Sequence, residues 1–360
     1  MGEGTPPGPA DVALPDGILV PGFVDLQVNG YYGQELMAAR PDGWAQVVRR
    51  LPETGTTAFL PTFITAPVDR LAVAFRAAAA IIADLPTGAR VLGLHLEGPF
   101  IAPSRRGAHN EDWIVDPTHV AIDQLLTAGR GLLRLVTLAP ERPGALAAIT
   151  QLTEAGVLVS VGHSDATAAQ VAQAAGQGAR MVTHLFDAQR PFHHREPGVV
   201  GQALGDPRLT SGLIADLQHV AGLACRIAFA AAPGRIALVT DAAACAGMAP
   251  GRYLLGGESI ELPPGAGRPP VRADGTLAGS ALRMDTGVAN MVAAGVDLAI
   301  AVAAATRVPA DLIGCPSLGR IAPGAVGDLV WLGPDLRARA TWIGGRQVFG
   351  PGDNSDGGRP

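Results

Sequence analysis

Three residues that commonly bind metal ions follow apolar runs typical of buried strands. Glu97 ends the run VLGLHLE, His163 follows VLVSVG, and His184 follows MVT. Two imidazoles and one carboxylate leave a fourth coordination position open, which is typical of a catalytic rather than a structural zinc site. Taken alone, each histidine is more simply interpreted as a hydrogen-bonded loop residue. Because the three occupy corresponding positions in a chain with 8 histidines, we predict that they share a metal ion.

A further carboxylate, Asp241, follows the apolar run IALVT. One interpretation is a helix N-cap, because alanines come next. The other is a general base, which takes a proton from water activated by the metal and returns it to a leaving amine. Beside a metal site, we favour the general base.

The elements that must position these side chains are eight short apolar runs, most of them followed by an alanine-rich helical stretch. Alternating strands and helices indicate a parallel sheet, and eight such units indicate a closed (β/α)8 barrel of the TIM type. An open doubly wound sheet is the alternative, but its GxGxxG turn is absent after the first run. In a barrel, the C-terminal ends of the strands would bring the polar residues into one active site. The predicted strands are Phe23–Val28, Ala58–Ile64, Val91–Leu96, Leu133–Leu138, Val157–Val161, Met181–Leu185, Gly212–Ala215 and Ile236–Thr240.

The pattern divides the chain into four parts. Residues 1–16 are an N-terminal segment, and residues 17–320 are the barrel, with a β-rich insertion at about 250–280. Residues 321–349 are predicted to form a small, reduced β-domain, whose two strands lie in GAVGDLVWLGP and ATWIGGRQVFG. Residues 350–360 are expected to be a disordered tail. Among the helices, Asp165–Ala175 includes the capping residue Thr167 and stops before Gly176.

Composition excludes several classes of function. The chain has no lysine, so Schiff-base catalysis, a P-loop and a carbamylated lysine bridging two metals are impossible. A net charge of −5 without a basic cluster argues against a nucleic-acid partner. We expect no membrane span and no signal peptide, and hence a cytoplasmic protein. The 3 cysteines are far apart and form no disulfide framework.

A series of motifs resembles the N-acetylglucosamine-6-phosphate deacetylases of the amidohydrolase superfamily. In order, these motifs are PGFVDLQVNG, GLHLEGPF, RRGAHN, VGHSDAT, THLFDA, HHREPG, IADLQHV, LVTDA and GTLAGSALRM. The resemblance extends from about residue 17 to 349. It implies hydrolytic deacetylation of an N-acetyl amino-sugar phosphate, with N-acetyl-D-glucosamine 6-phosphate as the lead substrate and glucosamine 6-phosphate and acetate as products.

The resemblance also assigns roles to individual residues. It implies that the metal is held by Glu97, His163 and His184, and that Asp241 is the acid and base. The remaining expected contacts are with the substrate: His219 polarises the acetamide carbonyl, His109 contacts sugar hydroxyls, and Arg195 faces the phosphate near Asp187 and Ala188. The planar guanidinium of Arg195 suits a phosphate, although a surface ion pair with Glu196 is the simpler interpretation.

The resemblance further implies a homodimer with one divalent metal ion per subunit. Many members of the superfamily carry HxH on the first strand and hold a second metal there, whereas this chain has Gln27-Val-Asn29. Amides are weaker metal ligands than imidazole. We expect zinc from the ligand types, with Fe²⁺ and Mn²⁺ as alternatives.

Three residues depart from the family pattern: Asp187 replaces asparagine, Gln189 replaces methionine, and Leu217 replaces glycine. A carboxylate at position 187 would repel a phosphate dianion. Either Arg190 compensates for this charge, or the substrate is a non-phosphorylated or otherwise different N-acyl amino sugar. A catalytically inactive sugar-binding homologue is a third hypothesis, which the complete set of ligands and base disfavours.

Overall fold

The structure is a computed structural model that describes residues 14, 16–265 and 267–351. Most of the N-terminal segment (1–16) and most of the tail predicted to be disordered (350–360) lie outside the described residues.

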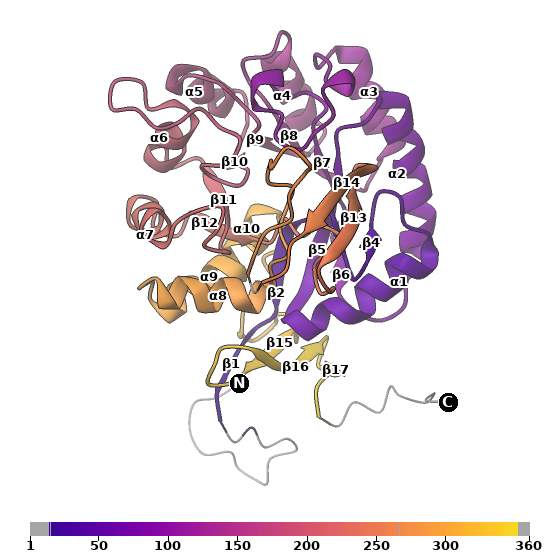
Figure 1. The fold of residues 1–360 in the computed structure, drawn as a ribbon, viewed down its shortest axis with the longest axis vertical. Coiled ribbons are helices and arrows are strands. Elements are labelled where there is room, and N and C mark those ends of the chain that lie inside the picture. The colour runs from indigo at the N-terminus through magenta and orange to yellow at the C-terminus, as the bar shows by residue number, and fades with distance from the viewer. Residues whose placement is uncertain (1–13, 15, 266, 352–360) are drawn as a thin grey trace.

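The core of the molecule is a barrel of eight parallel strands (Figure 1). They follow one another around the sheet in chain order, and β6 (Arg90–Val91) pairs with β5 alongside them. A parallel bridge between Val28 and Ala242 joins the two ends of the sheet. The predicted (β/α)8 barrel is therefore confirmed. Its strands are β2 (Phe23–Val28), β5 (Thr56–Ile64), β7 (Leu94–Glu97), β8 (Leu133–Leu138), β9 (Leu158–Val161), β10 (Met181–Val182), β11 (Thr210–Ile214) and β12 (Ile236–Val239).

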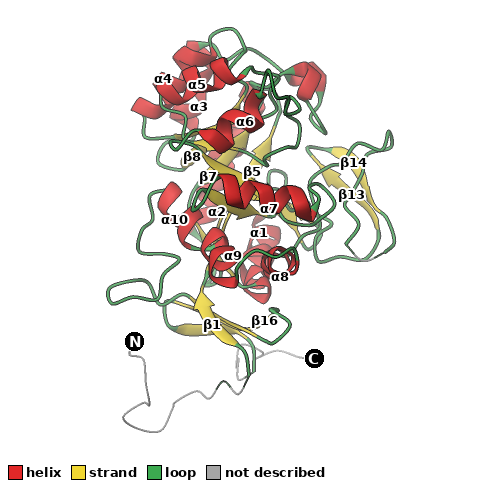
Figure 2. Cartoon of the chain, turned by 90° about the vertical axis from the view of Figure 1, so that its left-hand side faces the viewer, coloured by secondary structure: helices red, strands yellow, loops and turns green. Residues whose placement is uncertain are grey.

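Ten α-helices are present in the described part of the chain, and they cover the outside of the barrel or close one end of it (Figures 1 and 2). The predicted helix Asp165–Ala175 begins later than expected, because Thr167 caps it in a capping box with Gln170 and leaves Asp165 in the preceding loop. The helices are α1 (Pro41–Arg50), α2 (Val68–Ala83), α3 (His119–Ala128), α4 (Ala145–Glu154), α5 (Ala168–Gly176), α6 (Gly198–Gly205), α7 (Gly222–Ala231), α8 (Met284–Ala293), α9 (Leu298–Ala305) and α10 (Arg307–Leu312).

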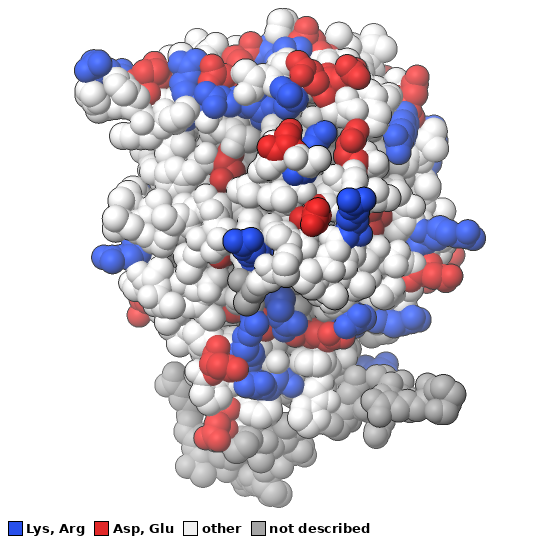
Figure 3. Space-filling model, in the orientation of Figure 1, with Lys and Arg blue, Asp and Glu red and all other residues white. Residues whose placement is uncertain are grey.

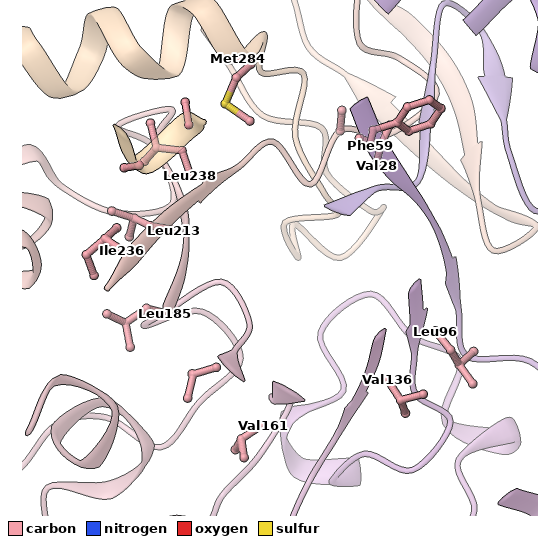
Figure 4. Close-up of a cluster of buried hydrophobic side chains, with 14 of the residues drawn as sticks. Val28, Phe59, Leu96, Val136, Val161, Leu185, Leu213, Ile236, Leu238 and Met284 are labelled. Carbon is pink, nitrogen blue, oxygen red and sulfur yellow. The ribbon is translucent and has the colours of Figure 1, made fainter. Parts of the chain in front are cut away.

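Burial on both faces of the strands explains their continuous apolar runs. All residues of β2 and β5 are buried. Figure 4 shows the larger cluster, in which Val136, Val161 and Leu213 come from three different strands around the barrel. A second cluster includes Leu60 and extends to Ile313, just beyond α10. Together the two clusters hold the strand ends rigidly in place.

A small antiparallel sheet with the order β1-β15-β16-β17 lies below the barrel (Figure 2). Its strands are β1 (Ile18–Pro21), β15 (Leu329–Leu332), β16 (Ala338–Ile343) and β17 (Arg346–Phe349). The segment predicted as one strand in ATWIGGRQVFG forms two, because Gly344 and Gly345 adopt φ values of +60° and +80° and turn the chain. Because β1 pairs with β15, we propose that the small β-domain combines residues 18–21 with the C-terminal strands.

The insertion that follows β12 forms a hairpin of β13 (Gly251–Leu255) and β14 (Glu258–Leu262), which lies across the front of the barrel in Figure 1. A second short pair, β3 (Gly30–Tyr31) and β4 (Gln34–Glu35), follows β2. No helix in the described ranges is both long and apolar enough to cross a membrane. On the face drawn in Figure 3, acidic and basic side chains lie intermixed.

Candidate active site

A cavity of about 300 Å³ opens where the C-terminal ends of the strands meet the hairpin insertion. Asn29, Glu97, His163, His184 and Asp241 reach it from the ends of barrel strands, as the sequence predicts for this fold. The predicted residues that line it are Glu97, His109, His163, His184, Asp187, Ala188, His219 and Asp241.

Glu97, His163 and His184 form the cluster expected of a metal site. The Nε2 atoms of His163 and His184 lie 3.2 and 3.0 Å from Oε1 of Glu97. The two Nε2 atoms are 3.1 Å apart, and ligand atoms of all three residues fall within 4.8 Å of one another. These three side chains can therefore hold one metal ion.

The hydrogen bonds of the two imidazoles support this assignment. Nδ1 of His163 donates to the carbonyl oxygen of Arg105 at 2.9 Å, and Nδ1 of His184 donates to that of Asp187 at 3.1 Å. Neutral imidazoles with Nδ1 protonated present bare lone pairs at Nε2. Two such lone pairs facing each other repel, unless a cation lies between them and the carboxylate. The donor set therefore fits a divalent metal.

The backbone at the site is strained. His163, His184 and Asp241 have φ values of +47°, +20° and +48°. Side chains other than glycine rarely adopt this left-handed region, and such strain persists where the surrounding structure enforces it. Three of the predicted functional residues thus share an uncommon backbone conformation.

Amide side chains from the first barrel strand hold the carboxylates of the site. Nε2 of Gln27 donates to Oε1 of Glu97 at 2.9 Å, while its Oε1 accepts from Thr183. Burial alone would raise the pKa of Glu97, but the neighbouring imidazoles of His163 and His184 hold that pKa well below its usual range. Glu97 is therefore ionised, as a metal ligand must be.

Asp241 is buried beside the metal cluster. Its Oδ1 accepts a hydrogen bond of 2.7 Å from Nδ2 of Asn29. Burial, and next the negative charge of Glu97, raise the pKa of Asp241. The alternative role as a helix cap is not realised, because no helix begins within ten residues of Asp241. A desolvated carboxylate with a raised pKa is suited to accept and return a proton.

His219 faces the same cavity from the loop after β11. Its Nδ1 donates to Oδ2 of Asp216 at 2.7 Å, which leaves Nε2 available for a ligand. Burial alone would lower the pKa of His219, but the hydrogen bond and charge of Asp216 outweigh burial and raise it. The imidazolium form is therefore favoured.

His109 lies in the loop after β7 and also borders the metal cluster. Its Nδ1 is 2.7 Å from Oγ1 of Thr65, and its Nε2 is 3.8 Å from Oε2 of Glu97. Burial, and next the neighbouring His163, lower the pKa of His109 to about 3. A neutral imidazole at this position is suited to hydrogen bonding with a ligand hydroxyl group.

Asp187, which replaces the asparagine of the family pattern, lines the cavity. Its Oδ2 atom is buried and has no hydrogen-bond partner among the described residues. The expectation that Arg190 compensates for this charge is wrong, because Nη2 of Arg190 binds Oδ2 of Asp165 instead. Leu217 has φ +62°, a conformation that favours the glycine of the family pattern.

Arg195 does not line the cavity of its own chain. It is exposed, and its Nη1 lies 2.8 Å from Nε2 of the adjacent His194. Arg195 therefore lies apart from the cavity where the structure brings the other predicted residues together. Sequence reasoning also missed part of the lining, since Leu255, Thr276 and Leu277 reach the cavity from the insertion. The motif GTLAGSALRM, which contains the latter two, was the available signal.

A (β/α)8 barrel with a cluster of metal-binding side chains and a nearby aspartate is the architecture of a metal-dependent hydrolase. The model of the amidohydrolase family matches residues 18–348. The chain is thus an enzyme of the amidohydrolase class.

Relatives specify the family further. An N-acetylgalactosamine-6-phosphate deacetylase from Escherichia coli O157:H7 is 38% identical, over 91% of this chain and 87% of its own. The N-acetylglucosamine-6-phosphate deacetylase of Bos taurus is 40% identical, over 92% and 83%. A variant of the Mycobacterium smegmatis enzyme, solved in complex with N-acetyl-D-glucosamine-6-phosphate, superposes with a TM-score of 0.91 at 38% identity, over 96% of this chain and 91% of its own. The chain belongs to the N-acetylglucosamine-6-phosphate deacetylase family.

Proposed function

We propose that this enzyme hydrolyses the acetamide of N-acetyl-D-glucosamine 6-phosphate to give glucosamine 6-phosphate and acetate. The observation that carries the proposal is the convergence of Glu97, His163 and His184 beside Asp241 and His219 in one cavity. The relatives named above support the choice of substrate.

We propose one divalent metal ion per subunit, held by Glu97, His163 and His184. When bound, the ion supplies Lewis-acid chemistry. Gln27 and Asn29 donate their amide hydrogens to Glu97 and Asp241, and their amide oxygens are weaker metal ligands than the imidazoles of an HxH motif would be, so we propose no second metal there. Zinc is our choice on ligand type, with Fe²⁺ and Mn²⁺ as alternatives.

His219 polarises the acetamide carbonyl in this proposal. Because Asp216 accepts the proton of Nδ1, Nε2 can donate a hydrogen bond only when the imidazole is protonated. The raised pKa of His219 favours that form. The imidazolium then stabilises the negative charge that develops on the carbonyl oxygen.

Asp241 acts as general base and then as general acid. It takes a proton from the attacking water and returns it to the nitrogen of the leaving amine, so one carboxylate serves both steps. Asn29 holds one oxygen of Asp241 and leaves the other free for this transfer. The proton balance is closed, because the proton removed in the first step is the one required in the second.

The substrate contacts are also proposals. His109 binds sugar hydroxyls, and Asp187 and Ala188 border the position of the 6-substituent. We further propose a homodimer. Arg195 lies outside its own cavity, so its proposed contact with phosphate fits an arrangement in which it serves the cavity of a second subunit.

A panel of N-acetyl sugars tests the substrate. We expect acetate release from N-acetylglucosamine 6-phosphate to exceed that from free N-acetylglucosamine, with N-acetylgalactosamine 6-phosphate as the comparison for the sugar. Asp187 favours a second candidate, a deacetylase of non-phosphorylated N-acyl amino sugars, and a preference for the free sugar would support it. Absence of turnover with any sugar at full metal content would indicate an inactive sugar-binding homologue.

A further inference from the structure

Asp165 lies in the loop after β9, and its carboxylate joins two other loops that border the cavity. Oδ1 accepts hydrogen bonds from Nε and Nη2 of Arg105 at 3.0 and 2.7 Å. Oδ2 accepts one from Nη2 of Arg190 at 3.0 Å. Arg105 comes from the loop after β7, and Arg190 from the loop after β10. We propose that Asp165 is a positioning residue that holds these loops in place around the metal site; this proposal rests on the proposed function.

Arg105 connects Asp165 directly to His163, one of the proposed metal ligands. The guanidinium of Arg105 binds Asp165, while its carbonyl oxygen accepts the Nδ1 hydrogen of His163 at 2.9 Å. The carbonyl oxygen of His163 in turn accepts from the backbone N–H of Ala102 at 2.9 Å. A displacement of Arg105 would therefore rotate the His163 imidazole or remove its hydrogen-bond partner. Such partners fix the orientation of metal-binding histidines.

Arg190 connects Asp165 to the neighbouring loop, which carries the cavity residues Asp187 and Ala188. The backbone N–H of Arg190 donates to the carbonyl oxygen of Ser164, and that of Ser164 donates to the carbonyl oxygen of Ala188, both at 3.1 Å. These bonds align the loop that carries Asp187 and Ala188 with the loop of Asp165. The side-chain hydrogen bond from Arg190 to Asp165 joins the same two loops a second time.

The loop of Asp165 has its own support. Oε1 of Glu141 accepts from the backbone N–H of Asp165 at 2.6 Å, and Oε2 accepts from Oγ of Ser164 at 2.8 Å. These contacts do not involve the carboxylate of Asp165. Replacing that carboxylate by an amide should therefore leave its own loop folded, while it removes the negative charge that attracts both arginines and leaves them one acceptor oxygen instead of two.

The exposure of this cluster limits its contribution to stability. The side chains of Asp165, Arg105 and Arg190 are 37%, 31% and 33% exposed. Ion pairs of this kind stabilise a fold by about 0–1 kcal/mol. If a variant of Asp165 loses more in kcat/KM and zinc retention than its loss of folding stability explains, Asp165 acts by positioning the loops.

The experiment compares Asp165→Asn with Asp311→Asn, both loaded with Zn²⁺. Asp311 is a matched control, because it binds Arg320 through two hydrogen bonds of 2.7 and 2.8 Å at a similar exposure of 40% and does not line the cavity. We expect Asp165→Asn to lose about tenfold in kcat/KM for N-acetylglucosamine 6-phosphate and to release zinc to a chelator about tenfold faster. Its melting temperature should stay within about 4 °C of the original protein. Asp311→Asn should match the original protein in kcat/KM and zinc release.

Two results would overturn the positioning role. One is that zinc release and kcat/KM of Asp165→Asn equal those of the original protein. The other is that Asp311→Asn shows the same losses. Because zinc release is measured without substrate, failure of the original protein to deacetylate the sugar phosphate would contradict the proposed function alone.

Discussion

The Nε2 atoms of His163 and His184 lie 3.1 Å apart, and each imidazole commits its Nδ1 hydrogen to a backbone carbonyl. When both imidazoles are neutral, neither Nε2 has a proton to donate to the other. A cation bound to both nitrogens and to Glu97 would remove the repulsion between their lone pairs. Several of the expected outcomes depend on this metal site.

We expect His163→Ala to lose both bound metal and deacetylase activity, because only two ligands remain. Elemental analysis of the purified protein measures the metal directly. His119→Ala is the matched control, since His119 is exposed on α3 and contacts Gln151 rather than the cavity. Full metal content in His163→Ala would contradict the ligand assignment.

We expect Asp241→Asn to keep its metal and lose about 10²–10⁴-fold in kcat, because an amide of the same shape cannot accept the proton. The measurement is steady-state turnover beside metal content. Normal turnover in this variant would remove Asp241 from the mechanism.

The pH dependence of kcat/KM tests the imidazolium of His219. Activity should fall as the pH rises through the raised pKa of His219, because neutral His219 cannot donate from Nε2. Asp216→Asn removes the charge that raises this pKa, so the alkaline decline should move to lower pH. An alkaline decline that stays in place or moves to higher pH would refute this role.

Asp187→Asn tests the charge in the cavity. Removing a carboxylate that repels a phosphate dianion should raise the ratio of kcat/KM for N-acetylglucosamine 6-phosphate over N-acetylglucosamine by about tenfold, or 1.4 kcal/mol. Asp311→Asn serves again as the remote control. If the ratio falls or does not change, Asp187 does not act on the 6-substituent.

Much of the fold could be predicted because parallel barrel strands are buried on both faces. That burial produced predominantly apolar runs such as Leu133–Leu138, whose bounds match β8. Polar residues at the ends of several runs, such as Glu97 and Asp241, then marked the site. Turn geometry was harder to foresee, as shown by Gly344 and Gly345, which split a run with continuous β-propensity into β16 and β17.

Contacts between loops could not be predicted, since they depend on the direction of individual side chains. Arg190 was one of two alternatives offered for the charge of Asp187, yet its side chain binds Asp165 on a different loop. Arg195 was expected at the phosphate, yet it lies outside its own cavity. Asn29 was identified only as a poor metal ligand, whereas its hydrogen bond to Asp241 requires strands at the two ends of the sheet to meet.

The most direct test of the central claim is to titrate metal-free protein with Zn²⁺ while measuring acetate release from N-acetylglucosamine 6-phosphate. Our proposal predicts no turnover without metal, a linear rise with added zinc, and saturation at one ion per chain. Full activity in the metal-free protein, or saturation only at two ions per chain, would contradict it.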